Sequence, residues 1–161
     1  MEDPVRSKLD AIFRHHALSK RAEPERIRAV DDREAAILKA FAAARDTIIR
    51  PAMEEMGEYV KAQGYTYTID TEADGLGPDK AYNKADIRLT LYVDRQRSRK
   101  EDHPGLTVFC DKSRGLAQFH ARTFTSGRGG HAGLVGEFEI AEVTKELVQE
   151  KILAVIAEVF R

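Results

Sequence analysis

Cys110 and His120 are the two side chains that could act together as a nucleophile and a base. Both lie in segments where apolar and polar residues alternate, which is typical of strands. A hairpin with Asp111 opposite Leu116 places the small and apolar residues on one face. Its facing pairs are Cys110 with Ala117, Val108 with Phe119, and Leu106 with Ala121. Cys110 and His120 then lie on opposite faces of the sheet. We therefore expect no Cys–His dyad, and Cys110 is interpreted as a small buried hydrophobic residue.

His120 is the general acid or base candidate on the polar face of this hairpin. A carboxylate is needed to orient its ring, and Asp111, Asp86 and Glu137 share the expected face. No established catalytic motif accompanies these residues. We therefore predict no catalytic residue, and the chain favours a non-enzymatic role.

Two arginines on the same polar face, Arg88 and Arg122, could fork onto a carboxylate or a phosphate. Aromatic residues beside them, Tyr92, Phe109 and Phe124, are expected to be exposed and to favour a binding surface. The predicted ligand-binding residues are Arg88, Tyr92, Asp111, His120 and Arg122. The alternative is an ordinary solvated sheet face with cross-strand charge pairs.

Two loops carry weaker indications of a binding site than the polar sheet face does. The glycine-rich segment 127–133 precedes a strand rather than a helix, so it is interpreted as a flexible hairpin loop; Arg128 and His131 could contact an anion or a partner there. The basic cluster at 95–100 contains Arg95, Arg97, Arg99 and Lys100, which could contact single-stranded nucleic acid or simply form a solvated loop tip.

No residues with the spacing of a metal site are recognised. The acidic run 70–75 has the alternation of a calcium loop, but Ala81 stands where the bidentate glutamate belongs. We predict no metal and no cofactor.

Helical periodicity precedes the strands. A first helix is expected from Asp3 to a break at residues 19–24, and a second from Glu25 to Gln63. Pro51 should kink or split the second helix near Arg50, and Gly64 should end it.

Five strands with short connections follow, at about residues 65–70, 84–94, 106–111, 116–125 and 134–141. A final helix is capped by Thr144. Such short connections exclude parallel crossovers. The predicted fold is a two-layer α+β domain: a five-stranded antiparallel meander sheet with long N-terminal helices and a C-terminal helix on one face, in the order α-α-β-β-β-β-β-α. We expect a helical arm over residues 1–24 and a single domain over residues 25–161.

Composition limits the class of protein. The 161 residues carry a net charge of −1, which argues against nucleic-acid binding driven by counterion release. A single cysteine and the lack of a long apolar run favour a cytoplasmic protein without membrane contact.

The supply of amphipathic helix exceeds what one five-stranded sheet can cover. We therefore expect a non-enzymatic protein-binding or assembly module that self-associates through its N-terminal helices, as a homo-oligomer or with a protein partner. A homodimer through residues 25–63 is the specific expectation. The first alternative is a small-ligand binder or enzyme using the face around His120 and Arg122, and the second is single-stranded nucleic-acid binding at residues 95–100.

Overall fold

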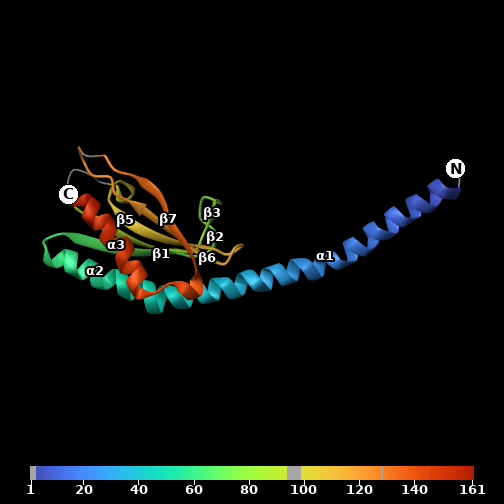
Figure 1. The fold of residues 1–161 in the computed structure, drawn as a ribbon, viewed down its shortest axis with the longest axis horizontal. Helices are drawn as coiled ribbons and strands as arrows, with labels where there is room; N and C mark the ends of the chain where they lie inside the picture. The colour runs from blue at the N-terminus through green and yellow to red at the C-terminus, as the bar shows by residue number, and fades with distance from the viewer. Residues whose placement is uncertain (1–2, 94–98, 128) are drawn as a thin grey trace. The chain divides into compact units, whose positions relative to one another are not determined.

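A computed structural model describes residues 3–93, 99–127 and 129–161. The predicted fold class is confirmed: N-terminal helix, five-stranded antiparallel sheet and C-terminal helix follow one another in the expected order (Figure 1). The chain divides into two compact units, residues up to Ala36 and Ile37–Arg161. No helix in the described ranges is long and apolar enough to cross a membrane.

The first helix, α1, runs unbroken over Asp3–Ala44 and contains Pro24. The break expected at residues 19–24 is therefore wrong. Pro24 removes one main-chain hydrogen bond, to the carbonyl of Lys20, but the residues on either side are strong helix formers. One missing bond is not enough to end so long a helix.

Pro51 does disturb the helix. A π-helical turn, η1 (Arg45–Ile49), leads into α2 (Arg50–Ala62), where Pro51 sits in the first turn. Proline tolerates this position because the first amides of a helix need no intrahelical acceptor. Gly64, with φ of +97°, ends the helix as expected.

Five antiparallel strands form the main sheet in the order β1-β4-β5-β6-β7. Their bounds are β1 Thr66–Glu72, β4 Asp86–Tyr92, β5 Gly105–Asp111, β6 Leu116–Arg122 and β7 Ala132–Glu139. A small ribbon of β2 (Gly75–Leu76) and β3 (Tyr82–Asn83) interrupts the meander where only a turn was expected. Strand β6 ends before the predicted residue 125.

The predicted hairpin register is confirmed. Asp111 faces Leu116, Cys110 faces Ala117, Val108 faces Phe119 and Leu106 faces Ala121. These apolar side chains are buried, and the final helix α3 (Lys145–Val159) packs over them together with α2. Thr144 caps α3 by accepting a hydrogen bond from the Leu147 amide at 3.1 Å.

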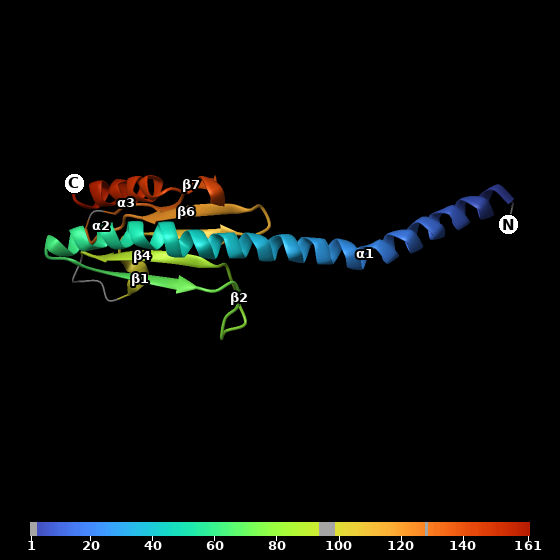
Figure 2. The ribbon, with the colours of Figure 1, turned by 90° about the horizontal axis from the view of Figure 1, so that it is seen from below.

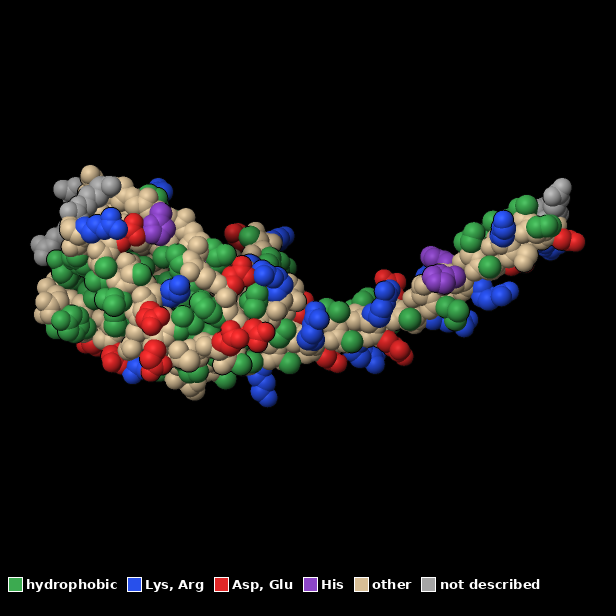
Figure 3. Space-filling view, viewed as in Figure 1, with side chains coloured by type: hydrophobic (Ala, Val, Ile, Leu, Met, Phe, Trp, Pro, Cys, Tyr) green, Lys and Arg blue, Asp and Glu red, His purple; other side chains and the backbone are tan. Residues whose placement is uncertain are grey.

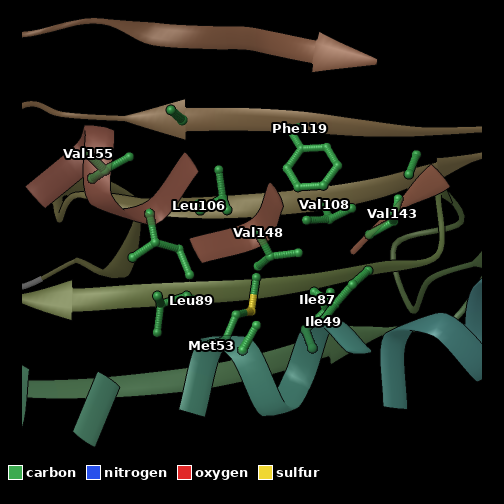
Figure 4. Packing of buried hydrophobic residues seen from close by; sticks show 14 of the residues in the cluster. Ile49, Met53, Ile87, Leu89, Leu106, Val108, Phe119, Val143, Val148 and Val155 are labelled. Carbon is green, nitrogen blue, oxygen red and sulfur yellow. The ribbon is translucent and has the colours of Figure 1, made fainter. Parts of the chain in front are cut away.

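Both α2 and α3 cover the same face of the sheet (Figure 2). Figure 4 shows Ile49 and Met53 against Ile87 and Leu89 of β4, with Val148 of α3 nearby. The opposite face of the sheet carries the polar residues. Residues 37–63 therefore place their apolar stripe in the chain's own core, since Phe41, Ile49 and Met53 are almost fully buried.

Some apolar side chains of α2 and α3 stay at the surface. Tyr59, Leu153 and Phe160 are exposed and, with Tyr65, line a groove between the two helices. Hydrophobic side chains gather over this part of the molecule in Figure 3. Two of its lining residues, Tyr65 and Phe160, pack against each other with their ring centroids 5.1 Å apart.

Candidate functional site

Strand pairing brings three of the predicted ligand-binding residues together on the open face, meaning the sheet face opposite α2 and α3. Arg88, Thr107 and His120 are aligned across β4, β5 and β6. The next row along the strands is Thr90, Gly105 and Arg122. Arg88, His120 and Arg122 therefore surround Thr107 and Gly105.

Gly105 leaves the centre of its row without a side chain. A Cβ added there would lie 2.1 Å from the carbonyl oxygen of Leu89, so the position accepts only glycine. Neighbouring strands lie about 4.8 Å apart, which separates the backbones of Thr90 and Arg122 by about 10 Å. An arginine side chain reaches across most of that distance.

The two arginines have few anionic partners. Arg122 donates from Nη1 to the carbonyl oxygen of Glu101 at 2.9 Å. Arg88 Nη2 lies 4.0 Å from Asp86 Oδ2, longer than a charge-assisted hydrogen bond. Burial lowers the pKa of Arg122, and the positive charge of Arg88 lowers it further. The site therefore concentrates like charge.

Within the described part of the chain, three donor atoms of this site are buried without a hydrogen bond. They are Arg88 Nε, Thr90 Oγ1 and Arg122 Nη2. Thr90 is fully buried. Buried polar atoms in native proteins almost always have a partner, so three such atoms on two adjacent rows are unusual.

His120 is half-buried against the edge of the Phe109 ring, with the ring centroids 5.0 Å apart. Burial lowers its pKa, the charge of Lys84 lowers it further, and the charge of Glu137 opposes both. His120 is therefore neutral near pH 7. Among the described residues, no hydrogen bond joins it to a carboxylate: Asp111, Asp86 and Glu137 contact the Ser113 hydroxyl, the Glu72 amide and the Arg114 guanidinium instead.

Asp111 lies outside this group, at the far end of β5. Its carboxylate accepts hydrogen bonds from the Ser113 hydroxyl at 2.8 Å and from the Ser113 and Arg114 amides at 3.2 Å. It therefore stabilises the turn between β5 and β6. Its inclusion among the ligand-binding residues is not supported by its position.

The aromatic residues were expected to be exposed, and for two of them this is wrong. Tyr92 and Phe109 are half-buried, while Phe124 is exposed beyond the end of β6. Tyr92 packs edge-on against the ring of His103, 4.7 Å between centroids, and its hydroxyl lies 3.1 Å from Thr68 Oγ1. His103 is buried, but no periodic pattern predicts its burial because it lies in a turn.

Cys110 lies on the covered face, opposite to His120, as predicted. The thiol is 1% exposed, and burial raises its pKa to about 11. A protonated, inaccessible thiol is a poor nucleophile. Within residues 3–93, 99–127 and 129–161, no cluster of three or more His, Cys, Asp or Glu residues could hold a metal ion.

The two basic loops are only partly described. Arg95, Arg97 and Arg128 lie outside the described residues. Lys100 binds Asp70 at 2.8 Å. His131 contacts Glu158 of α3 through Nδ1 at 3.1 Å, and its backbone amide donates to Thr123 Oγ1, so its contacts are within the chain.

A second surface lies on α1. Every side chain from Asp3 to Arg33 is exposed, although several are large and apolar. They are Val5, Leu9, Ile12, Phe13, Leu18, Ile27 and Val30. Phe13 is 67% exposed, more than a monomeric protein usually leaves of so large an apolar residue.

Comparison of the chain with protein-family models, curated protein sequences and solved structures finds no significant match. Function must therefore be inferred from the chain's own side chains.

Proposed function

We propose that this chain is a non-enzymatic assembly module in which residues 5–34 of α1 pair with the same residues of a second copy. The observation that supports it is the exposed apolar stripe of α1. This interface takes the place of the homodimer interface expected at residues 25–63. The apolar residues in the C-terminal part of that segment are buried in the chain's own core.

The apolar residues of the stripe lie on one side of the helix, in two groups at residues 5–13 and 27–30. At about 100° per residue, Val5, Leu9, Ile12, Phe13, Ile27 and Val30 fall within an arc of about 100°. Leu18 lies on the opposite side, about 180° from Leu9. An arc of this width is typical of a helix that packs against another helix.

Polar residues in the middle of the stripe determine the orientation. Lys20 and Glu23 lie there, between the apolar groups at residues 5–13 and 27–30. In an antiparallel pair, Lys20 lies opposite Glu23 of the partner subunit, and the reciprocal pair forms by symmetry. In a parallel pair, each charge faces its own copy. Charge complementarity therefore favours antiparallel pairing.

The antiparallel register also pairs one apolar residue of each group. With Lys20 opposite Glu23 of the partner subunit, Phe13 falls opposite Val30 of the partner subunit, whereas Ile12 and Ile27 fall opposite Asp31 of the partner subunit and His16 of the partner subunit. Fully burying one such side chain stabilises a complex by about 1.5–3 kcal/mol, and symmetry doubles the number of contacts. Pairing also supports a helix whose described side chains are exposed from Asp3 to Arg33.

The test is sedimentation equilibrium of the full chain and of single variants at micromolar concentration. Phe13→Glu and Ile27→Glu place a charge in the stripe and should give a monomer. Leu18→Glu is the matched control on the opposite side of the same helix and should remain a dimer. Circular dichroism of each variant checks that helix content is unchanged.

A charge exchange separates the two orientations. Lys20→Glu should weaken the dimer, and adding Glu23→Lys should restore it, because the antiparallel pair then has the same charges exchanged. A parallel pair has like charges in the wild type and in the double variant alike. A dimer equally stable in all three proteins contradicts the proposed orientation, and a monomeric wild type contradicts the proposed function.

A further inference from the structure

We propose that the open face of the sheet binds a small anionic group, a carboxylate or a phosphate, between Arg88, Thr90 and Arg122. This inference does not depend on self-association of α1, because every residue involved lies in the unit Ile37–Arg161. It goes beyond an assembly role by assigning a ligand class to a specific set of atoms.

The unpaired atoms indicate what the ligand must supply. Arg88 Nε and Arg122 Nη2 can only donate hydrogen bonds, and the Thr90 hydroxyl can also donate. Each of the three atoms exposes less than 1 Å² to solvent, so an anion contacts them only when the side chains that cover them move. A ligand with acceptor oxygens satisfies all of them, whereas a ligand that offers only donors satisfies none of the arginine atoms.

The charges of the neighbouring groups favour a negative ligand. Near the two guanidinium groups, Lys100 is paired with Asp70, and His120 is held neutral by burial. Asp86 is buried and accepts a hydrogen bond from the Glu72 amide at 3.1 Å.

The carboxylates of Glu101 and Asp102 raise the pKa of Arg122. Burial and the charge of Arg88 lower it by more, so the pKa of Arg122 is lowered overall. The repulsion between the arginines is therefore only partly compensated. An anion between them removes that repulsion and forms charge-assisted hydrogen bonds.

The fold holds these groups on rigid elements. Arg88 and Thr90 belong to β4, a central strand, and Arg122 ends β6. Gly105 adds no side chain between Thr90 and Arg122, and the backbone of Leu89 fills the place where its Cβ would lie. The Arg122 guanidinium is anchored by its Nη1 bond to the Glu101 carbonyl oxygen, which leaves Nη2 for a ligand.

The probes are inorganic phosphate and acetate, each compared with sodium chloride at equal ionic strength. Binding is measured by calorimetry and by the shift in melting temperature of the full chain. The proposal is supported if phosphate, acetate or both bind more tightly than chloride. Which of the two binds distinguishes a phosphate ligand from a carboxylate ligand. Equal effects of all three salts would overturn it.

The variants Arg88→Gln and Arg122→Gln should each weaken binding about tenfold or more, because each removes a charged donor. Arg114→Gln is the matched control: it removes the same charge from an exposed arginine that pairs with Glu137 at 2.8 Å. It should bind like the wild type. Thr90→Val keeps the shape of the buried side chain, so it tests the site even where an arginine variant fails to fold. Undiminished binding in Thr90→Val and in the folded arginine variants contradicts the assignment.

Discussion

Replacing Thr90 by valine should stabilise the protein, although threonine and valine have almost the same shape. Thr90 is fully buried, and its hydroxyl has no hydrogen-bond partner among the residues that the structure describes. A hydroxyl buried in this way costs about 1–3 kcal/mol, because its hydrogen bonds to water are lost on folding and not replaced. Thr90→Val removes the hydroxyl and keeps the packing. We expect the free energy of unfolding to rise by about 1–2 kcal/mol.

The assay is urea unfolding followed by tyrosine fluorescence. All five tyrosines lie between residues 59 and 92, so the signal reports on the unit that contains Thr90. The chain has no tryptophan to obscure it. A gain of 1 kcal/mol corresponds to a rise in melting temperature of about 2–4 °C for a chain of this size.

Thr68→Val is the matched control. Thr68 faces Thr90 across the β1–β4 pair, but its hydroxyl lies 3.1 Å from the Tyr92 hydroxyl. Its removal should lower the free energy of unfolding by about 1 kcal/mol. A loss of stability in Thr90→Val as well would refute the reasoning, since it would mean that the Thr90 hydroxyl has a partner. Saturating phosphate should shrink the gain in Thr90→Val, because the anion supplies the missing acceptor.

Two further outcomes follow from the titratable groups. Cys110, with its pKa raised to about 11 by burial, should not react with an aromatic disulfide reagent at pH 8 until the protein is unfolded in urea; prompt reaction of the native protein contradicts the described burial. The pKa of Asp111 is lowered: burial acts to raise it, but the hydrogen bonds from Ser113 and Arg114 and the positive charges of Lys84 and Arg114 together outweigh that effect. A lowered folded-state pKa stabilises the protein above the ordinary pKa of the carboxyl, and this contribution is lost as the pH falls through the folded-state value. Asp111→Asn should therefore lower the free energy of unfolding by about 1 kcal/mol at pH 7 and by less below about pH 4, measured by urea unfolding; a pH-independent difference speaks against the charged hydrogen bonds.

The sheet could be predicted from the sequence because its pattern has a period of two. A slip of one residue would move Cys110, Val108 and Leu106 to the polar face, so only one register buries all three. The cap at Thr144 and the stop at Gly64 have similarly local causes. These features are encoded by a few neighbouring residues.

Features that depend on distant residues were missed. Pro24 signals a break by itself, but α1 continues because the surrounding helix formers outweigh one lost hydrogen bond. The alternation of polar and apolar residues places Thr90 and Thr107 on a polar face, yet both are buried. Their burial depends on neighbouring strands and on turns such as the one that carries His103. The convergence of Arg88 and Arg122 requires the pairing of three strands, and no spacing along the chain expresses it.

Sedimentation equilibrium of the wild type beside Phe13→Glu tests the central claim most directly. The proposed assembly predicts a wild-type mass of twice 18.1 kDa at micromolar concentration and a single-chain mass for the variant. A wild-type mass of 18.1 kDa over the whole concentration range, or a dimer that Phe13→Glu leaves intact, would contradict it.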